Sequence, residues 1–250
     1  MGVCNHCRTE PENTFDFTMA FQPIVKLSSN SVWGYEALVR GPGGEGAGTI
    51  LGKLSDENRY WFDQSCRVKA IELAAGMLPS DRYLSINFMP SAVYEPRACI
   101  RKTLQTAEQT GFEPSRLMFE FTENERIANP DHVKKIVKTY RQMGFLTGFD
   151  DFGAGYAGLV LLSQFQPDII KIDMELLRNI DSNHAKQVIL EGIIEIARDL
   201  GIALLAEGIE TEAEFRFLRG TAIDLFQGYY FAKPQTGSLP VLNEQFANAV

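Results

Sequence analysis

The segment Ala20–Val39, "AFQPIVKLSSNSVWGYEALV", contains two strand-like apolar runs, Ala20–Val25 and Val32–Val39. The link between them, "KLSSN", is too short to hold the crossover helix that two parallel strands require. Pro23 lies inside the first run and has no N–H to donate, which favours an edge or irregular position in a sheet. We therefore predict that the sheet opens with an irregular antiparallel pair of strands.

The rest of the chain alternates strand-like segments with helical patterns. Helices are predicted over Asp63–Leu78, Asp131–Met143 and Ala185–Leu200. Further strands are predicted near Tyr83–Phe88, Leu117–Phe121, Phe145–Phe149, Asp168–Ile172, Ala203–Ala206 and Ile223–Phe226. Strands that alternate with helices in this way favour a closed parallel sheet. The predicted fold class is α/β, a modified (β/α)8 TIM-type barrel with an antiparallel opening strand.

The helix predicted over Ala185–Leu200 has the clearest pattern in the chain. Gly201 stands where a glycine can end the helix. Apolar and small residues recur at a spacing of three and four, which predicts a stripe buried against the sheet. The stripe consists of Val188, Ile189, Gly192, Ile193, Ile196, Ala197 and Leu200.

Length and charge restrict the possible functions. The 250 residues suffice for one barrel, and we expect a flexible tail over residues 1–16 followed by one domain over residues 17–250. The net charge of −8 argues against a nucleic-acid polymer as a partner. No apolar run is long enough for a membrane span, and residues 1–20 lack the apolar segment of a signal peptide. We therefore expect no membrane span and a cytoplasmic location.

The tail contains three soft metal ligands in the sequence "CNHC", namely Cys4, His6 and Cys7. One interpretation is part of a zinc or redox site that another chain completes. The other is a flexible tail without a site, because the sequence contains no second closely spaced cysteine pair.

Polar side chains stand at the carboxyl ends of the predicted strands, which converge on one face of a barrel. Crowded carboxylates repel one another unless cations neutralise them, and oxygen ligands from Glu, Asp and Asn suit Mg²⁺ or Mn²⁺. The histidines His6, His132 and His184 lie on none of these ends, which disfavours a zinc or histidine-built di-iron site. The residues at the strand ends are Glu36, Asn87, Glu120, Asp150, Asp151, Lys171, Glu207, Glu210 and Gln227.

The segment Gly148–Leu159, "GFDDFGAGYAGL", has two interpretations. Its glycines satisfy the G-x-G-x-x-G pattern of a dinucleotide-binding loop, but Asp150 and Asp151 before them would repel a pyrophosphate. The "DFG" of kinases is present without the other kinase motifs. We interpret the two aspartates as a metal-binding pair, one of them bridging two ions, beside a mobile glycine loop.

Seven motifs in this order resemble the EAL-domain cyclic di-GMP phosphodiesterases of bacteria: "EALVR", "SINFMP", "FEFTE", "FDDFGAGY", "DIIKID", "AEGIE" and "FQGYYFAKP". The resemblance runs from about Phe17 to Pro234. It implies that residues 17–250 form an EAL phosphodiesterase domain with an antiparallel opening strand. It also implies hydrolysis of cyclic di-GMP to linear pGpG, and a homodimer formed through the face near the loop after the fifth strand.

The resemblance also implies a role for each matching residue. Two Mg²⁺ or Mn²⁺ ions are expected, one held by Glu36, Asn87, Glu120 and Asp150, the other by Asp150 with Asp151. Lys171 would contact the hydrolytic water or the phosphate, and Glu207 would assist at the metal-bound water. The substrate would be held by Gln22, Arg40, Glu210 and Gln227.

One motif departs from the family pattern D-D-F-G-T-G-Y-S-S-L. Ala154, Ala157 and Gly158 replace residues that carry hydroxyls, which removes up to three hydrogen bonds of about 1 kcal/mol each. Glu123, which by resemblance anchors this loop, is retained. The metal ligands are therefore expected to be intact while the position of the loop is in question.

Two other functions are left open by the sequence. The first is a non-catalytic receptor for cyclic di-GMP or a protein-interaction module. The second is a barrel glycosidase that uses Glu120 and Glu207. It would leave Asn87, Asp150, Asp151 and Lys171 without a purpose. A phosphodiesterase should lose activity on chelation, and Ca²⁺ should inhibit it, because Ca²⁺ acidifies water weakly and has longer bonds and a looser geometry.

Overall fold

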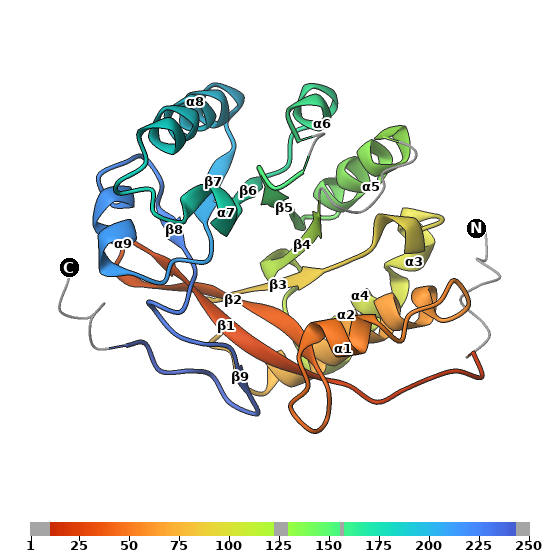
Figure 1. Cartoon of the computed structure of the whole chain (residues 1–250). Helices are drawn as coiled ribbons and strands as arrows, with labels where there is room; N and C mark the ends of the chain where they lie inside the picture. The colour runs from red at the N-terminus through yellow and green to blue at the C-terminus, as the bar shows by residue number, and fades with distance from the viewer. Residues whose placement is uncertain (1–10, 123–129, 156–157, 244–250) are drawn as a thin grey trace.

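The computed structural model describes residues 11–122, 130–155 and 158–243, and one sheet in this part of the chain closes into a barrel (Figure 1). Strand β1 pairs antiparallel with β2 on one side and with β8 on the other. From β2 to β8 each strand lies parallel to the next. This arrangement confirms the predicted modified (β/α)8 barrel. The strands are β1 (Thr18–Lys26), β2 (Ser31–Arg40), β3 (Tyr83–Asn87), β4 (Leu117–Thr122), β5 (Leu146–Phe152), β6 (Ile169–Ile172), β7 (Ala203–Ala206), β8 (Leu225–Phe226) and β9 (Gln235–Thr236).

The irregular opening predicted from Pro23 is present. Pro23 pairs with Tyr35 of β2, next to a shift in register between Ile24 and Val25. The other edge of β1 carries two short ladders, one to β8 at Val25 and Lys26 and one to β9, which the sequence analysis did not predict. Pro23 lies between these ladders, so the edge beside it needs no regular pairing.

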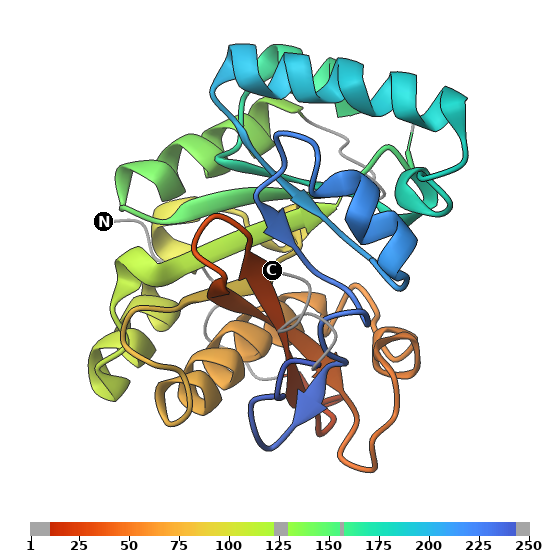
Figure 2. The same cartoon turned by 90° about the vertical axis from the view of Figure 1, so that its left-hand side faces the viewer.

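The helices lie on the outside of the sheet, as Figures 1 and 2 show. The three predicted helices are confirmed as α2, α5 and α8, each within a few residues of its expected bounds. Helix α8 begins after Asn183, whose side chain accepts a hydrogen bond from the Lys186 N–H, and ends at Gly201 in the left-handed conformation. The helices are α1 (Ala47–Leu51), α2 (Arg59–Ala75), α3 (Pro96–Cys99), α4 (Arg101–Thr110), α5 (Pro130–Gln142), α6 (Gly158–Gln164), α7 (Met174–Leu177), α8 (His184–Leu200) and α9 (Glu212–Leu218), with short 3₁₀ turns at Pro90–Ala92 and Pro114–Arg116.

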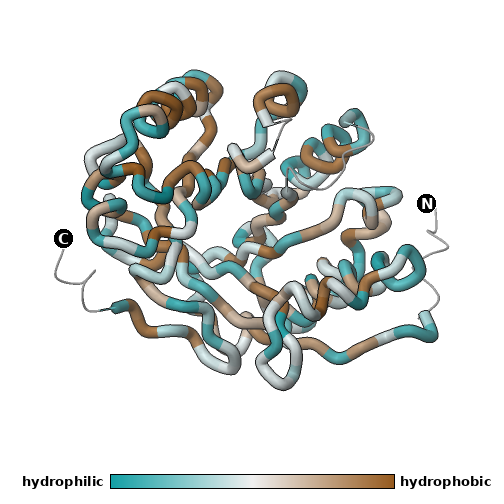
Figure 3. The backbone as a smooth tube through the Cα atoms, in the orientation of Figure 1, coloured by the Kyte–Doolittle hydropathy of each residue, from teal (hydrophilic) through white to brown (hydrophobic). Residues whose placement is uncertain are grey.

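The predicted buried stripe of α8 is wrong for four of its residues. Within α8 only Leu190 and Ala197 are fully buried. The side chains left exposed are Val188, Ile189, Ile196 and Leu200, at 53, 54, 39 and 44%. Apolar residues surround much of this helix, and the barrel covers only the side that carries Leu190 and Ala197. Figure 3 shows apolar residues along α8. The periodicity predicted the helix but not the face that packs on the sheet.

The structure bears only partly on the predicted tail. Phe15 packs against Trp61 and Phe62 of α2, with ring centroids 5.5 and 5.6 Å apart. The boundary at residue 16 and the flexibility of the tail remain predictions, and Cys4, His6 and Cys7 lie outside the described residues. Among the described helices, none is both long and apolar enough to cross a bilayer.

Candidate functional site

The interior of the barrel has an apolar layer with a polar layer directly above it. The apolar layer comprises Ile24 of the antiparallel strand β1 and Met118, Ile169, Leu205 and Leu225 of the parallel strands. Side chains on one face of a strand recur every second residue. Each of these apolar residues therefore has a polar residue on the same face, two positions away along the chain. Those polar residues are Gln22, Glu120, Lys171, Glu207 and Gln227, and β1 contributes Gln22 in the reverse direction because it is antiparallel.

Lys171 stands at the centre of the polar layer. Its Nζ lies 2.9 Å from Glu120 Oε2, 2.9 Å from Asp150 Oδ1, 2.6 Å from Glu207 Oε1 and 3.3 Å from Glu36 Oε2. The Lys171 side chain is 1% exposed, and the side chains of its four partners are 0 to 16% exposed. Four carboxylates therefore face one cation where water is largely excluded, and we define these five residues as the mouth cluster.

The excess of acids perturbs the titration of the mouth cluster. Burial, reinforced by Glu36 and Asp150 and opposed by Lys171, raises the pKa of Glu120 to about 8. Burial and the charge of Asp150 raise the pKa of Glu207 well above its ordinary value. Burial alone would lower the pKa of Lys171, but the four carboxylates raise it well above its ordinary value. The cluster is thus short of positive charge.

Asp150 belongs to two groups of carboxylates. Oxygens of Glu36, Glu120 and Asp150 lie within 4.8 Å of one another, and the same holds for Asp150, Asp151 and Glu207. The register between β5 and β6 shifts between Phe149 and Phe152, and Asp151 has a φ of 56°. This left-handed turn at the end of β5 lets the two adjacent carboxylates face the same site.

The amides of the site hold Glu36 from two sides. Asn87 Nδ2 donates to Glu36 Oε1 at 2.8 Å, and Gln227 Nε2 donates to Glu36 Oε2 at 2.8 Å. Gln227 also donates to Gln22 Oε1 at 3.2 Å. Because the NH₂ of Asn87 is engaged by Glu36, its oxygen is the atom available to a ligand. Glu36 lies in the middle of β2 and not at its end, because pairing with β1 extends β2 to Arg40.

A glycine in β5 makes room for Glu120. Gly148 pairs with Glu120 in the parallel ladder between β4 and β5. A Cβ at position 148 would lie 2.9 Å from Glu120 Cγ, closer than carbon atoms tolerate. This requirement was not among the predictions from the sequence, although Gly148 stands two residues before Asp150.

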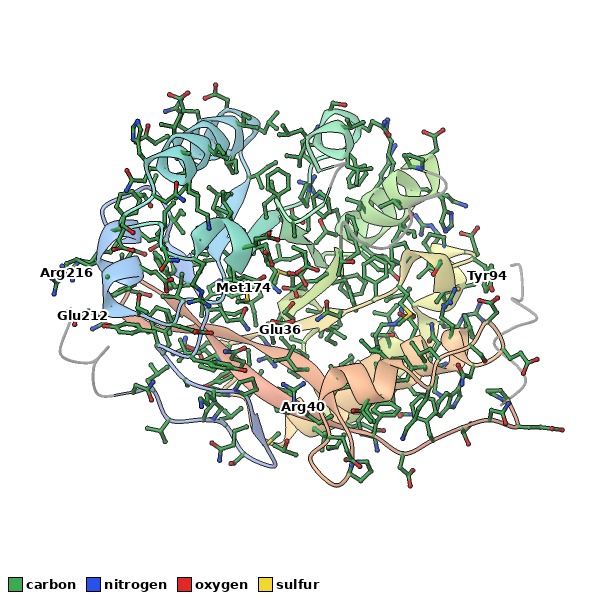
Figure 4. All side chains as sticks on the ribbon, viewed as in Figure 1. Glu36, Arg40, Tyr94, Met174, Glu212 and Arg216 are labelled. Carbon is green, nitrogen blue, oxygen red and sulfur yellow. The ribbon has the colours of Figure 1, made fainter. Side chains whose placement is uncertain are left out.

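Arg40 and Glu210 bind groups outside the mouth cluster. Arg40, at the end of β2, donates from Nη1 to its own neighbour Val39 O at 2.7 Å, and Figure 4 shows it beyond Glu36 along that strand. Glu210 is 46% exposed and pairs with Arg178 at 3.1 Å. Glu123 and Ala157 lie outside the described residues. The roles predicted for all of these residues remain predictions.

Sequence reasoning missed the connection that fixes the segment after β7. Glu214, 2% exposed, accepts hydrogen bonds from the backbone N–H groups of Asn179, Glu210 and Thr211. It also pairs with Arg178 at 3.2 Å. This carboxylate ties α9 to the segments that follow β6 and β7, and therefore supports the strand ends that carry Lys171 and Glu207. The capping box of Thr211 and Glu214 was a signal in the sequence for the start of α9.

Comparison with known proteins identifies the family. The family profile described as "EAL domain" matches residues 9–234. The chain belongs to the EAL domain family. Among curated proteins it is 32% identical over 234 residues to the blue light- and temperature-regulated antirepressor BluF of Escherichia coli K12, covering 94% of this chain and 58% of BluF. It is also 32% identical to the probable cyclic di-GMP phosphodiesterase PdeG of the same organism, covering 90% of this chain and 46% of PdeG.

Solved EAL structures share the fold. A standalone versatile EAL protein from Vibrio cholerae O395, in its c-di-GMP bound form, has a TM-score of 0.90 at 50% identity, covering 94% of this chain and 99% of that one. Klebsiella pneumoniae BlrP1, in a manganese/cy-diGMP complex, has a TM-score of 0.83 at 34% identity, covering 94% of this chain and 61% of BlrP1. The EAL chain thus spans about half the length of the curated relatives named above, and nearly all of the Vibrio protein.

Proposed function

We propose that this EAL domain is a metal-dependent phosphodiesterase that hydrolyses cyclic di-GMP to linear pGpG. The observation that carries the proposal is the mouth cluster, in which four carboxylates, three of them buried and Glu207 partly buried, surround a single ammonium. A pure receptor for an anionic dinucleotide gains nothing from such an excess of negative charge, because the carboxylates repel the ligand. Divalent cations turn the same excess into a binding site for a phosphodiester.

The side chains fit hard divalent cations. Their donors are carboxylate and amide oxygens, the set that Mg²⁺ and Mn²⁺ prefer. Glu120 Oε1 is buried, and no hydrogen bond of normal geometry from a described residue reaches it. The positively charged ammonium of Lys171 already lies among these acids, 2.9 Å from both Glu120 Oε2 and Asp150 Oδ1. The residues proposed to hold the two ions are Glu36, Asn87, Glu120, Asp150 and Asp151.

The chain's own residues then have distinct tasks. When bound, the two ions would acidify a water molecule and stabilise charge on the phosphate. Asp150 belongs to both carboxylate groups and would serve both ions. Lys171 would place its positive charge at the reacting phosphate, and Glu207 would accept a proton or orient the water. Gln22, Gln227, Arg40 and Glu210 are proposed to hold the substrate, with Arg40 turning from Val39 O to a phosphate.

The relatives support both the reaction and its main alternative. PdeG is named a probable cyclic di-GMP phosphodiesterase, and the Vibrio and Klebsiella structures contain c-di-GMP. BluF is named an antirepressor, so an EAL domain that acts through a protein partner is a second candidate. The retained carboxylates of the mouth cluster favour catalysis, because a protein-interaction module does not need them buried together.

The test measures binding and product on one sample. The chain is incubated with cyclic di-GMP in Mg²⁺, Mn²⁺, Ca²⁺ or EDTA, binding is followed by calorimetry, and nucleotides are separated by chromatography. We expect pGpG in Mg²⁺ or Mn²⁺, none in EDTA, and binding without product in Ca²⁺, whose looser coordination misplaces the nucleophile. Addition of Mn²⁺ to the Ca²⁺ sample should restore pGpG. Binding in Ca²⁺ with no product in either activating ion would make the domain a receptor.

We also propose that the chain forms a homodimer through α6 and α8. These helices lie on one side of the barrel in both ribbon views (Figures 1 and 2). On α6, Leu159 and Val160 are each 59% exposed, and α8 exposes Val188, Ile189 and Ile196. Such a gathering of large apolar side chains is unusual for a face open to water.

Charge substitutions on that face test the dimer. Val160→Asp combined with Ile189→Asp should convert a dimer to a monomer in sedimentation velocity, because two carboxylates per chain would be desolvated at the interface. The control is Gln105→Asp on the exposed side of α4, which should leave the sedimentation coefficient unchanged. A monomer in the parent chain at micromolar concentration, or a dimer in the double variant, contradicts the assignment.

A further inference from the structure

A second group of buried charges lies outside the barrel, between α2 and α5. Asp63 and Arg67 on α2 are 2% and 0% exposed and form an ion pair through Asp63 Oδ2. Arg67 also donates from Nη1 to Tyr140 Oη of α5 at 3.4 Å and from Nε to Asp63 O at 3.3 Å. None of these three residues is part of the mouth cluster, and the proposed reaction gives them no task.

The second oxygen of Asp63 reaches the segment that follows β3. Asp63 Oδ1 accepts a hydrogen bond from the backbone N–H of Met89 at 2.8 Å. Met89 comes two residues after Asn87, the amide that donates to Glu36 in the mouth cluster. One carboxylate on an outer helix is therefore connected, through a short stretch of backbone, to a proposed metal ligand.

The segment from Asn87 to Met89 is held at three successive residues. The Asn87 side chain is bonded to Glu36, the Phe88 N–H donates to Glu120 O at 2.8 Å, and the Met89 N–H donates to Asp63. The Phe88 ring also packs against Tyr140, with centroids 5.7 Å apart. Tyr140 thus contacts both Arg67 and the residue after Asn87, so the outer network and the segment form one packed unit.

Stability alone is a weak reason to bury this pair. Removing two ions from water costs several kcal/mol for each ion, and replacing a buried pair by apolar side chains of similar volume is often neutral or stabilising. An ion pair retained at such a cost is better explained by the geometry that it imposes. Here the geometry concerns a backbone N–H that an apolar residue at position 63 could not bind.

We propose that Asp63, paired with Arg67, is a positioning residue: by binding the Met89 N–H it sets how far the Asn87 side chain extends toward the metal. The inference rests on the proposed function, because it treats Asn87 as a metal ligand. Residues that orient metal ligands typically change metal affinity by about 10- to 100-fold when they are substituted. The expected effect of losing Asp63 is at the lower end of that range, since Asp63 acts through backbone.

The experiment compares two ways of removing the carboxylate. Asp63→Asn keeps the shape but leaves one acceptor oxygen for both Met89 and Arg67. Asp63→Leu combined with Arg67→Met removes both charges, and should preserve or raise the melting temperature in EDTA. The control is Asp56→Asn, because the Asp56 side chain is 93% exposed and forms a surface ion pair with Arg59. The probe is Mn²⁺ alone, titrated by calorimetry, with melting curves recorded in EDTA.

We expect Mn²⁺ to bind about tenfold more weakly to both Asp63 variants and unchanged to the control. The double variant should keep this loss although its melting temperature is restored. If Mn²⁺ affinity follows the melting temperature and returns in the double variant, Asp63 is merely structural and the inference is wrong. Equal affinity in the parent chain and all variants overturns it as well. A parent chain that binds no Mn²⁺ overturns the proposed function, and this inference with it.

Discussion

The chain buries two groups of charged side chains, and the groups differ in their ratio of acids to bases. Between α2 and α5, one carboxylate faces one guanidinium, Asp63 against Arg67, with Met89 and Tyr140 completing the contacts. In the mouth cluster, four carboxylates face the single ammonium of Lys171. A balanced buried pair can be complete without a ligand, whereas an excess of buried carboxylates is stable only with protons or additional cations. The ratio of acids to bases therefore distinguishes an ion pair that supports the fold from a site that binds cations.

The largest effects are expected when one acid is removed from each group. Glu36→Ala should lower hydrolysis of cyclic di-GMP by orders of magnitude, because a proposed metal ligand is lost. It should not lower the melting temperature in EDTA, because removing an acid relieves repulsion in the mouth cluster. Asp63→Ala should instead lower the free energy of unfolding by about 3–5 kcal/mol, because it leaves a buried guanidinium unpaired. Chromatographic turnover assays and thermal melts measure the two effects.

The opposite pattern would remove the contrast between the two groups. Near-normal turnover of the Glu36 variant at saturating Mn²⁺ would show that Glu36 is not a required ligand. A melting temperature lowered equally by both substitutions would show that the mouth cluster is as structural as the outer pair.

The next effect concerns the pH dependence of stability without metal. The Glu120 pKa is raised from an ordinary 4.5 to about 8 by burial, so the folded chain binds a proton there that the unfolded chain has lost. The stability due to this proton is complete below pH 4.5 and is lost as the pH rises toward 8, at no more than about 1.4 kcal/mol per pH unit. Melting temperatures in EDTA should therefore fall between pH 5 and 8.

The control variant for that measurement is Glu120→Gln. The glutamine does not titrate, so the slope of melting temperature against pH should become shallower. An unchanged slope would place the titration elsewhere, and a stability that rises over the same range would contradict the predicted charge imbalance.

The smallest expected effect concerns the loop beside the mouth cluster. Restoring hydroxyls by Ala154→Thr, Ala157→Ser and Gly158→Ser should raise activity or metal affinity, with up to about 1 kcal/mol for each hydrogen bond formed. Substrate identity should not change, because the substitutions leave the mouth cluster intact. Metal-titration curves of hydrolysis compare the parent chain with the triple variant. Identical curves would show that packing already positions the loop without the hydroxyls.

Much of the fold and the site could be predicted because their signals are local. The short link after Lys26 and the irregular position of Pro23 indicated the antiparallel opening, and the structure has both features. Residues such as Met118 and Glu120, two apart on a strand, share one face, so an apolar layer with a polar layer above it is already present in the sequence. Closure of the parallel strands then brings the polar positions together.

The remaining features depend on contacts between distant parts of the chain. The periodicity predicted helix α8. It could not show that Val188 and Ile189 are exposed, because their exposure depends on which side of the helix packs on the barrel. The sequence also could not show that Asp63 binds Met89, or that Glu214 binds Asn179, since these pairs are 26 and 35 residues apart.

The sequence by itself determined which residues form the strands, which side chains share a strand face and which chemical groups gather at the barrel mouth. Only the tertiary structure decided how those groups contact one another. It places one ammonium among four carboxylates, turns Arg40 to the backbone of Val39, and supports the segment after Asn87 with a second ion pair. The physical reason is that strand periodicity is a property of neighbouring residues. Burial, the distances between charges and the resulting pKa values arise only when separate segments pack and exclude water.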